Sequence, residues 1–215
     1  MDDNKIEIIP GILEKEWEEI EKKLEAIKTF AKSAHVDFID GKFADNLTYL
    51  GFASFKPFPS DLFLEAHLMV ENPIEYLKPL ADAGFRRFIG HVEKMPDITE
   101  FVAKAQILGE VGLALDGPTD INALDDINMD DLDCLLVMTI KAGRSGQVFM
   151  PEHLEKVRKL REKTSISIEI DGGINNSTIV TGRESGAVRF VATSFIWNSD
   201  SPEESYKKLE QTLKQ

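Results

Sequence analysis

The sequence predicts a single (β/α)8 barrel, the TIM-barrel fold, over residues 1–215. A length of 215 residues suits one compact core, and a composition of 42% hydrophobic and 29% charged residues is ordinary for a globular chain. Short β-rich runs alternate with longer amphipathic runs from end to end, the pattern of a parallel sheet built through crossover helices. Eight such runs favour a closed barrel, because a doubly wound sheet more often has roughly five or six strands.

The strands are expected where apolar and β-branched residues cluster. In chain order they are Ile6–Ile12, His35–Asp40, Phe63–Val70, Arg87–Val92, Val111–Asp116, Cys134–Ile140, Ile166–Asp171 and Arg189–Ile196.

The helices between the strands carry one apolar face. In Glu14–Phe30 the apolar residues recur at helical spacing, with glutamates and lysines opposite. A second helix is expected from Pro73 to Gly84, and the final one from Pro202 to Lys214 with Ser201 as its cap. We expect these helices to coat the barrel.

One segment, Leu47–Asp61, leaves little room for a regular helix, because it contains Gly51, Pro57 and Pro59. We expect a long loop there, which is either a lid or partner surface or simply irregular packing. Its phenylalanine-rich part, Phe52–Phe63, is a candidate interface in a homo-oligomer.

The net charge of −13 argues against nucleic acid and anionic lipid as partners, since both require clustered Lys and Arg. The first residues lack the features of a signal peptide, and no segment approaches the ~20 apolar residues that cross a bilayer. We therefore expect a cytoplasmic protein without membrane contact. The single cysteine, Cys134, lies in an apolar run and is expected to be buried and unreactive.

Ionisable side chains are expected inside the barrel at three strands, because residues i and i+2 of a strand share a face. The pairs are His35 with Asp37, Glu65 with His67, and Glu169 with Asp171. Buried ionisable groups are costly unless they pair or bind a metal. A hydrogen-bonded structural pair explains each one alone, but together they favour a site at the carboxyl ends of the strands, where barrels place their active sites.

The nitrogen and oxygen donors of His35, Asp37, His67 and Asp171 suit one divalent ion, Zn2+, Fe2+, Mn2+ or Co2+. Two other histidines carry less weight. His91 ends the fourth strand near Glu93, and its expected place is behind the ligands. His153 begins a helix and is expected at the surface.

Three late strand exits are rich in glycine and small polar residues, which let backbone N–H groups approach a phosphate. Plain turn chemistry is the alternative. The candidate phosphate-binding residues are Gly143, Arg144, Ser145, Gly146, Gly172, Gly173, Thr193 and Ser194.

From about Ile8 to Trp197 the chain resembles the ribulose-phosphate 3-epimerase family. The similarity is carried by His35-Val36-Asp37-Phe38-Ile39-Asp40-Gly41-Lys42-Phe43, Asn46, His67-Leu68-Met69-Val70, Val137-Met138-Thr139, Gly146-Gln147-Val148-Phe149 and Glu169-Ile170-Asp171-Gly172-Gly173-Ile174.

This resemblance implies that the four side chains hold the metal and that Asp37 and Asp171 are also the acid and base. The implied reaction inverts C3 of a ketose phosphate, D-ribulose 5-phosphate to D-xylulose 5-phosphate, through a cis-enediolate. His67 would also contact the substrate, and Met69 and Met138 would form an apolar cap, although core packing explains the methionines nearly as well.

The sequence departs from the family at the substrate side. Gly11 stands where the family usually has serine, Ile39 where it has methionine, and Thr193 where it more often has glycine. Residues 142–146 also differ from the usual loop. Two alternatives therefore stay open: a 3-epimerase of a ketohexose 6-phosphate such as D-allulose 6-phosphate, and a non-catalytic phosphate- or partner-binding barrel.

Overall fold

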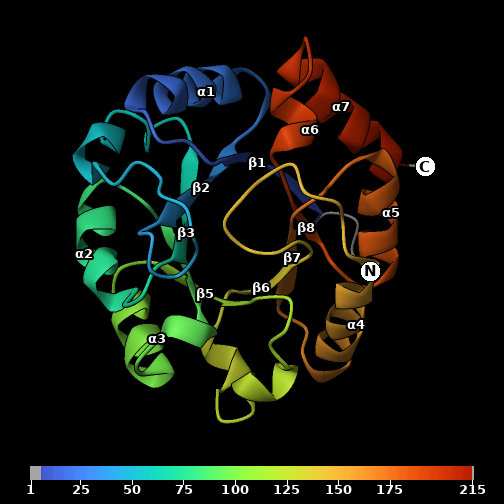
Figure 1. Ribbon diagram of the computed structural model, residues 1–215. Coiled ribbons are helices and arrows are strands. Elements are labelled where there is room, and N and C mark those ends of the chain that lie inside the picture. The colour runs from blue at the N-terminus through green and yellow to red at the C-terminus, as the bar shows by residue number, and fades with distance from the viewer. Residues whose placement is uncertain (1–5, 215) are drawn as a thin grey trace.

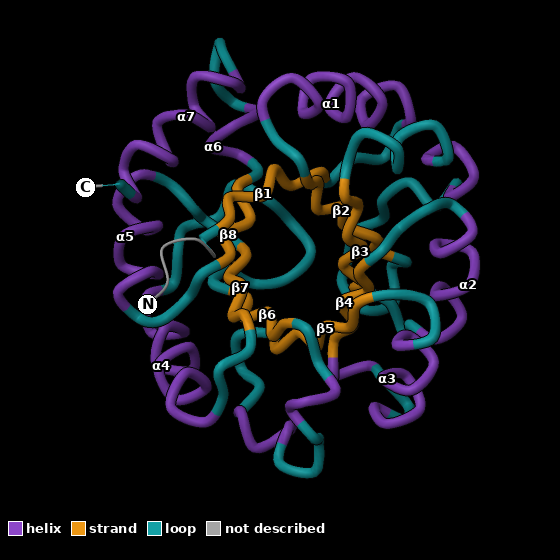
Figure 2. Tube along the Cα trace, turned by 180° about the vertical axis from the view of Figure 1, so that it is seen from behind, coloured by secondary structure: helices purple, strands orange, loops and turns teal. Residues whose placement is uncertain are grey.

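The computed structural model describes residues 6–214, which form a closed barrel of parallel strands in the order β1 to β8, as predicted. The strands make an inner ring with the helices outside it (Figures 1 and 2). The strands are β1 Glu7–Ile12, β2 Ser33–Ile39, β3 Phe63–Met69, β4 Arg87–His91, β5 Glu110–Leu115, β6 Cys134–Met138, β7 Ser167–Asp171 and β8 Arg189–Ala192.

The α-helices cover the outer surface of the ring. They are α1 Trp17–Phe30, α2 Ile74–Asp82, α3 Ile98–Gln106, α4 Leu154–Lys163, α5 Asn176–Glu184, α6 Ser194–Trp197 and α7 Pro202–Leu213. The cap of α7 forms as expected, because the Ser201 side chain accepts a hydrogen bond from the Glu204 backbone.

The connection from β2 to β3 contains only a short 3₁₀ helix, Phe52–Phe55, which agrees with the expected long loop. Phe55 and Phe58 are buried, and the Phe55 ring packs edge-on against Trp17 of α1 at 5.1 Å between centroids. These two phenylalanines therefore contribute to the core in place of the missing helix. An interface over Phe52–Phe63 in a homo-oligomer stays a prediction.

The connection from β5 to β6 also lacks an α-helix, which the alternating pattern did not predict. Its place is taken by 3₁₀ turns at Ile121–Leu124 and Met129–Asp131. The side chains of Asp120 and Asn128 accept hydrogen bonds from backbone N–H groups two residues on. Asp and Asn compete with helical hydrogen bonding in this way, so the segment folds as successive turns.

The eighth strand is shorter than predicted. It ends at Ala192, and the residues expected to continue it to Ile196 instead begin α6. Thr193 stands at the junction, with φ −106° and ψ −79°, outside the extended conformation. The strand therefore ends at the mouth of the barrel, and the backbone turns there into α6.

Alternate residues of each strand face either the helices or the barrel interior. Val36 and Phe38 pack with the apolar faces of the helices, whereas Ile39, Met69 and Leu136 belong to a separate cluster within the barrel. His35 and Asp37 share the face of Ile39 and thus point inward.

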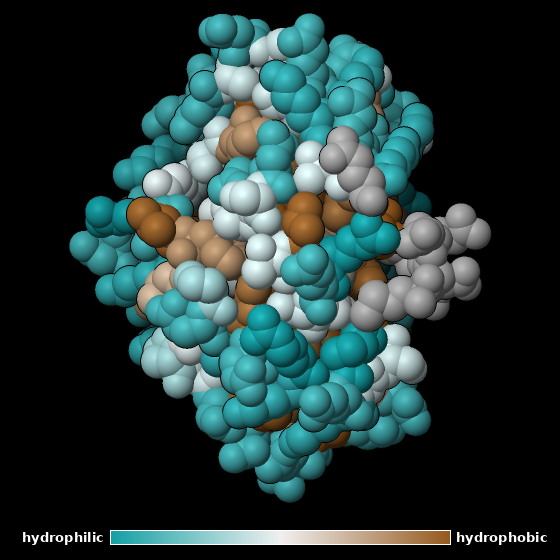
Figure 3. All heavy atoms as spheres, turned by 90° about the vertical axis from the view of Figure 1, so that its right-hand side faces the viewer, coloured by the Kyte–Doolittle hydropathy of each residue, from teal (hydrophilic) through white to brown (hydrophobic). Residues whose placement is uncertain are grey.

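The face of the molecule over α4, α5 and α7 is largely polar, with a few apolar side chains near its centre (Figure 3). Among the described residues no helix has the length and apolar character to cross a membrane.

Candidate metal centre and active site

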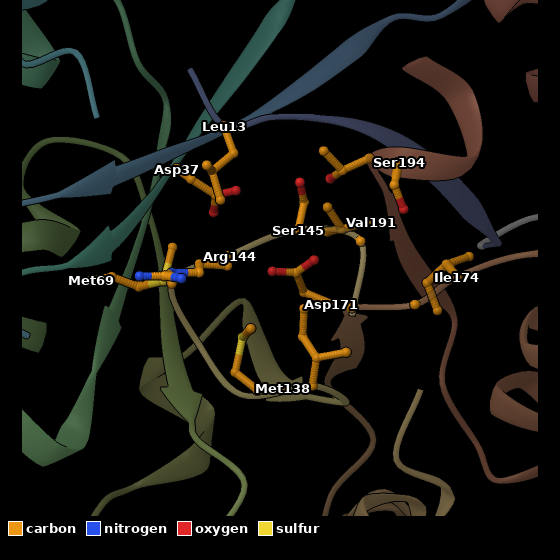
Figure 4. A pocket seen from close by; sticks show the side chains of 16 residues that line it. Leu13, Asp37, Met69, Met138, Arg144, Ser145, Asp171, Ile174, Val191 and Ser194 are labelled. Carbon is orange, nitrogen blue, oxygen red and sulfur yellow. The ribbon is translucent and has the colours of Figure 1, made fainter. Parts of the chain in front are cut away.

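Four side chains from three strands converge near the carboxyl ends of the barrel strands. His35, Asp37, His67 and Asp171 each place a ligand atom within 4.8 Å of the others, and all four are buried. Figure 4 shows the carboxylates of Asp37 and Asp171 reaching into the same space from opposite walls. The inward parity of β2, β3 and β7 brings these residues together.

His35 provides a test of whether the cluster fits a metal. Its Nε2 atom is buried and has no hydrogen-bond partner, although Asp37 Oδ1 lies 3.3 Å away. A buried nitrogen without a partner costs free energy unless something else engages it. Two imidazoles and two carboxylates are a donor set that divalent first-row ions accept. The residues therefore fit one divalent cation.

A buried ionic layer orients His35 from below. Its Nδ1 lies 2.8 Å from Glu65 Oε1, and Glu65 Oε2 is held by Arg87 and Arg189, each at 2.6 Å. Arg189 Nε also donates to Glu169 at 2.7 Å. Because Glu65 accepts the Nδ1 proton, Nε2 is the atom that can offer a lone pair to a cation once its own proton is displaced.

Glu65 and Glu169 could also hold a metal with His35 by distance alone. Arg189 pairs with both carboxylates, however, and Arg87 also pairs with Glu65, so arginines already offset their charge. We therefore assign this lower group to structure and the upper group to metal binding.

His67 is oriented from behind by His91, which lies where its position at the end of the fourth strand suggested. The two Nε2 atoms lie 2.9 Å apart, and His91 Nδ1 lies 3.0 Å from Glu93 Oε2. Glu93 accepts the Nδ1 proton of His91, so Nε2 of His91 accepts the Nε2 proton of His67. When a cation is bound, Nδ1 of His67, which lies 2.8 Å from Asp37 Oδ1, would offer its lone pair to that cation.

The two aspartates have opposite proton affinities. Burial alone would raise the pKa of Asp37, but the adjacent imidazoles of His35 and His67 outweigh it and hold this pKa at about 2. Burial, together with the negative charge of Asp37, raises the pKa of Asp171 to about 7. Without a cation, one carboxylate is thus ionised and the other holds a proton near neutral pH.

The surrounding carboxylates also act on His35. Burial would lower its pKa, but Asp37, Glu169 and Glu65 together raise it well above the ordinary value. A cation that binds Nε2 must therefore displace a proton.

A cavity opens above the two aspartates. It collects the methionines and all of the candidate phosphate-binding residues, whereas His35 and His67 are fully buried beneath it. Its lining includes Asp37, Met69, Met138, Gly143, Arg144, Ser145, Gly146, Asp171, Gly172, Gly173, Thr193 and Ser194.

The loop after β6 closes one side of this cavity and is attached to the loop after β2. Asn46 Nδ2 donates to the Gly143 carbonyl at 2.9 Å, and Arg144 donates to the Asp45 carbonyl at 3.1 Å. The Arg144 side chain is exposed, and its guanidinium connects the two loops. The residue also borders the cavity.

His153 corrects an expectation. It was expected at the surface, but it is buried and its Nδ1 lies 2.9 Å from the Met138 carbonyl. His153 thus ties the start of α4 to the end of β6, next to the cavity residue Met138. The run Pro151-Glu152-His153 has no apolar pattern that signals such burial.

Comparison with known proteins agrees with this geometry. The model of the ribulose-phosphate 3-epimerase family matches residues 7–197. The chain belongs to the ribulose-phosphate 3-epimerase family. It is 33% identical to ribulose-phosphate 3-epimerase of Schizosaccharomyces pombe, over 96% of this chain and 93% of the relative. It is 34% identical to that of Mycobacterium tuberculosis, over 91% and 87%.

Solved structures support the fold. KGPDC from Streptococcus mutans superposes with a TM-score of 0.73 at 12% identity, covering 97% of each chain. The 3-hexulose-6-phosphate synthase from Salmonella typhimurium gives 0.72 at 16% identity, covering 97% of this chain and 98% of that one. At such identities the likeness concerns the barrel alone, which the family shares with these enzymes.

Proposed function

We propose that this protein is an isomerase that inverts C3 of a ketose phosphate, interconverting D-ribulose 5-phosphate and D-xylulose 5-phosphate. The observation that carries the proposal is the pair Asp37 and Asp171, whose carboxylates reach into one cavity from opposite walls. Family membership supports the same reaction.

The chemistry follows from the two carboxylates. Asp37, ionised, removes the proton from C3 and leaves a planar cis-enediolate. Asp171, protonated, delivers a proton to the opposite face, so that the configuration at C3 is inverted. In the other direction the aspartates exchange roles, and solvent protons restore the starting state.

His35, Asp37, His67 and Asp171 would hold one divalent cation, whether Zn2+, Fe2+, Mn2+ or Co2+. A cation bound there supplies positive charge that stabilises the developing enediolate oxygens. Glu65 and His91 keep the histidine lone pairs directed at this position. Met69 and Met138 provide an apolar wall that shields the planar intermediate from water.

The phosphate group is proposed to bind at the opposite end of the cavity. Gly143, Gly146, Gly172 and Gly173 all have positive φ, which turns the backbone sharply at the exits of β6 and β7. Backbone N–H groups in such turns bind anions without side-chain charge, which suits a chain with a net charge of −13.

A ketohexose 6-phosphate, such as D-allulose 6-phosphate, is the second candidate substrate. Gly11, Arg144 and Thr193 differ from the family pattern and lie at the cavity or next to it. This difference motivates the second candidate substrate. A non-catalytic binding barrel is the third candidate. It does not explain why the protein buries two carboxylates, which costs free energy.

The deciding experiment compares kcat/KM of the metal-loaded protein on D-ribulose 5-phosphate and D-allulose 6-phosphate. The proposal expects turnover of both C3 epimers of the pentulose, with the larger kcat/KM on the pentulose. A larger value on the hexulose selects the second substrate. Binding of phosphate without turnover of either sugar selects the non-catalytic barrel.

We further propose a cytoplasmic place for the protein, as in the rice relative whose name specifies the cytoplasmic isoform. Association of the chain into a homo-oligomer stays a prediction that analytical ultracentrifugation would test.

A further inference from the structure

Thr193 and Gly11 lie side by side between the two proposed acid–base residues. Pro10 of β1 pairs with Ala192 of β8, so the next residues, Gly11 and Thr193, are neighbours at the mouth. In the closed barrel, β1 and β8 separate β2, which carries Asp37, from β7, which carries Asp171. Gly11 has the inward parity of β1, and Thr193, which follows β8, lines the cavity.

The Thr193 side chain occupies the space that a side chain on residue 11 would need. A Cβ built on Gly11 would lie 2.1 Å from Thr193 Oγ1 and 3.0 Å from Val191 Cγ1. Gly11 does not have positive φ, so the backbone itself does not require glycine there. The glycine is therefore explained by volume, and the hydroxyl of Thr193 fills that volume.

That hydroxyl is available to a ligand. Thr193 precedes α6, but its side chain makes no capping hydrogen bond, and the described residues provide no other partner for the hydroxyl. Thr193 lines the cavity above Asp37 and Asp171. A hydroxyl both donates and accepts a hydrogen bond, so the Thr193 hydroxyl can pair with a hydroxyl of the sugar. If one of these two hydroxyls were absent, the other would lose its partner.

We propose that Thr193 is a specificity-determining residue, whose hydroxyl binds a hydroxyl of the sugar next to the reacting carbon. The Thr193 hydroxyl makes this contact from the space that a side chain on residue 11 would otherwise occupy. This inference rests on the proposed function. It selects ketose phosphates with a free hydroxyl next to the C2–C3 unit, over analogues that lack it.

Kinetics of four variants on D-ribulose 5-phosphate test the inference. Thr193→Val keeps the shape and removes the hydroxyl, so kcat/KM should fall about tenfold, as for one lost hydrogen bond. Thr193→Ser keeps the hydroxyl and should stay within about threefold of the wild type. Gly11→Ser alone should lose activity because its Cβ has no room, while Gly11→Ser with Thr193→Gly moves the hydroxyl to β1 and should recover most of it.

Thermal unfolding tests the shared volume without any substrate. Gly11→Ala should lower Tm, and adding Thr193→Gly should restore part of the loss, which is non-additive behaviour of residues in contact. Additive changes would overturn the claim that the two residues compete for one space.

The outcomes separate the inference from the proposed function. An active wild type with a Thr193→Val variant of equal kcat/KM overturns the inference alone, as does a double variant no better than Gly11→Ser. A wild type inactive on every ketose phosphate overturns both.

Discussion

His91 lies directly behind His67 in the barrel wall, with their Nε2 atoms 2.9 Å apart and their rings stacked at 5.0 Å between centroids. Both side chains are fully buried. The acceptor that sets the direction of this contact is Glu93, at the outer end of the chain of hydrogen bonds. A residue outside the cluster thus determines which nitrogen of His67 is free.

Replacing His91 by Phe should weaken binding of a divalent ion on the order of 10- to 100-fold, because His67 loses the partner that fixes its proton. Competition with a chelating dye measures this affinity. Glu93→Gln should produce a smaller loss of the same kind. Glu100→Gln, an exposed glutamate on α3, is the control and should bind as the wild type does. Unchanged affinity in His91→Phe would refute the orienting role.

The raised pKa of Asp171 predicts that Asp171→Asn stabilises the metal-free protein. A folded-state pKa of about 7 lies above the ordinary 3.8, so the folded state disfavours the ionised form and this group lowers stability as pH rises from about 4 to 7. Asparagine does not ionise. The Tm advantage of the variant should therefore grow across this range to the order of 5 °C at pH 8.

The control for this experiment is Asp126→Asn, which changes an exposed aspartate on the β5–β6 connection. Its Tm should stay close to that of the wild type, because a substitution at an exposed position away from the site changes stability little. An Asp171→Asn variant that melts below the wild type at pH 8, with chelator present, would contradict the burial of an unfavourable charge.

Metal binding should release protons near neutral pH. The pKa of His35 is raised well above its ordinary value, so a cation that binds its Nε2 atom must displace a proton. The affinity therefore rises as pH increases from 6 to 8. Calorimetry in two buffers of different ionisation enthalpy counts the protons, with about one or more expected per ion. Identical heats in both buffers would count against these protonation states.

The ionic layer below the site should contribute strongly to stability. Arg189 is buried and pairs with Glu65 at 2.6 Å and Glu169 at 2.7 Å. Arg189→Met leaves both carboxylates short of a partner, at a cost of about 3–5 kcal/mol and a Tm lower by roughly 10 °C. Lys207→Met removes an exposed pair with Glu203 and should leave Tm nearly unchanged. Equal Tm values for the two variants would show that the buried ion pairs contribute no more to stability than an exposed pair.

The strands and the four converging side chains could be predicted because they depend on local spacing. His35 and Asp37 lie two residues apart on one strand, and that spacing alone places them on one face. Convergence with His67 and Asp171 then follows from closing the barrel, in which all strand ends meet at one mouth.

Other features depend on contacts between distant strands and could not be predicted. Arg189 was simply a residue at the start of a strand, although it is the partner of carboxylates on β3 and β7. The burial of His153 depends on a carbonyl of β6, and the relation of Gly11 to Thr193 depends on the β1–β8 register. No single strand or helix contains both members of any of these pairs.

The most direct test of the account is incorporation of solvent deuterium at C3 of D-ribulose 5-phosphate by the metal-loaded wild type, Asp37→Asn, Asp171→Asn and the control Asp126→Asn. The account predicts deuterium at C3 of both epimers for the wild type and the control, with loss of interconversion by about 10²- to 10⁴-fold in either site variant. Interconversion at the wild-type rate in either site variant, or without deuterium uptake in the wild type, would contradict it.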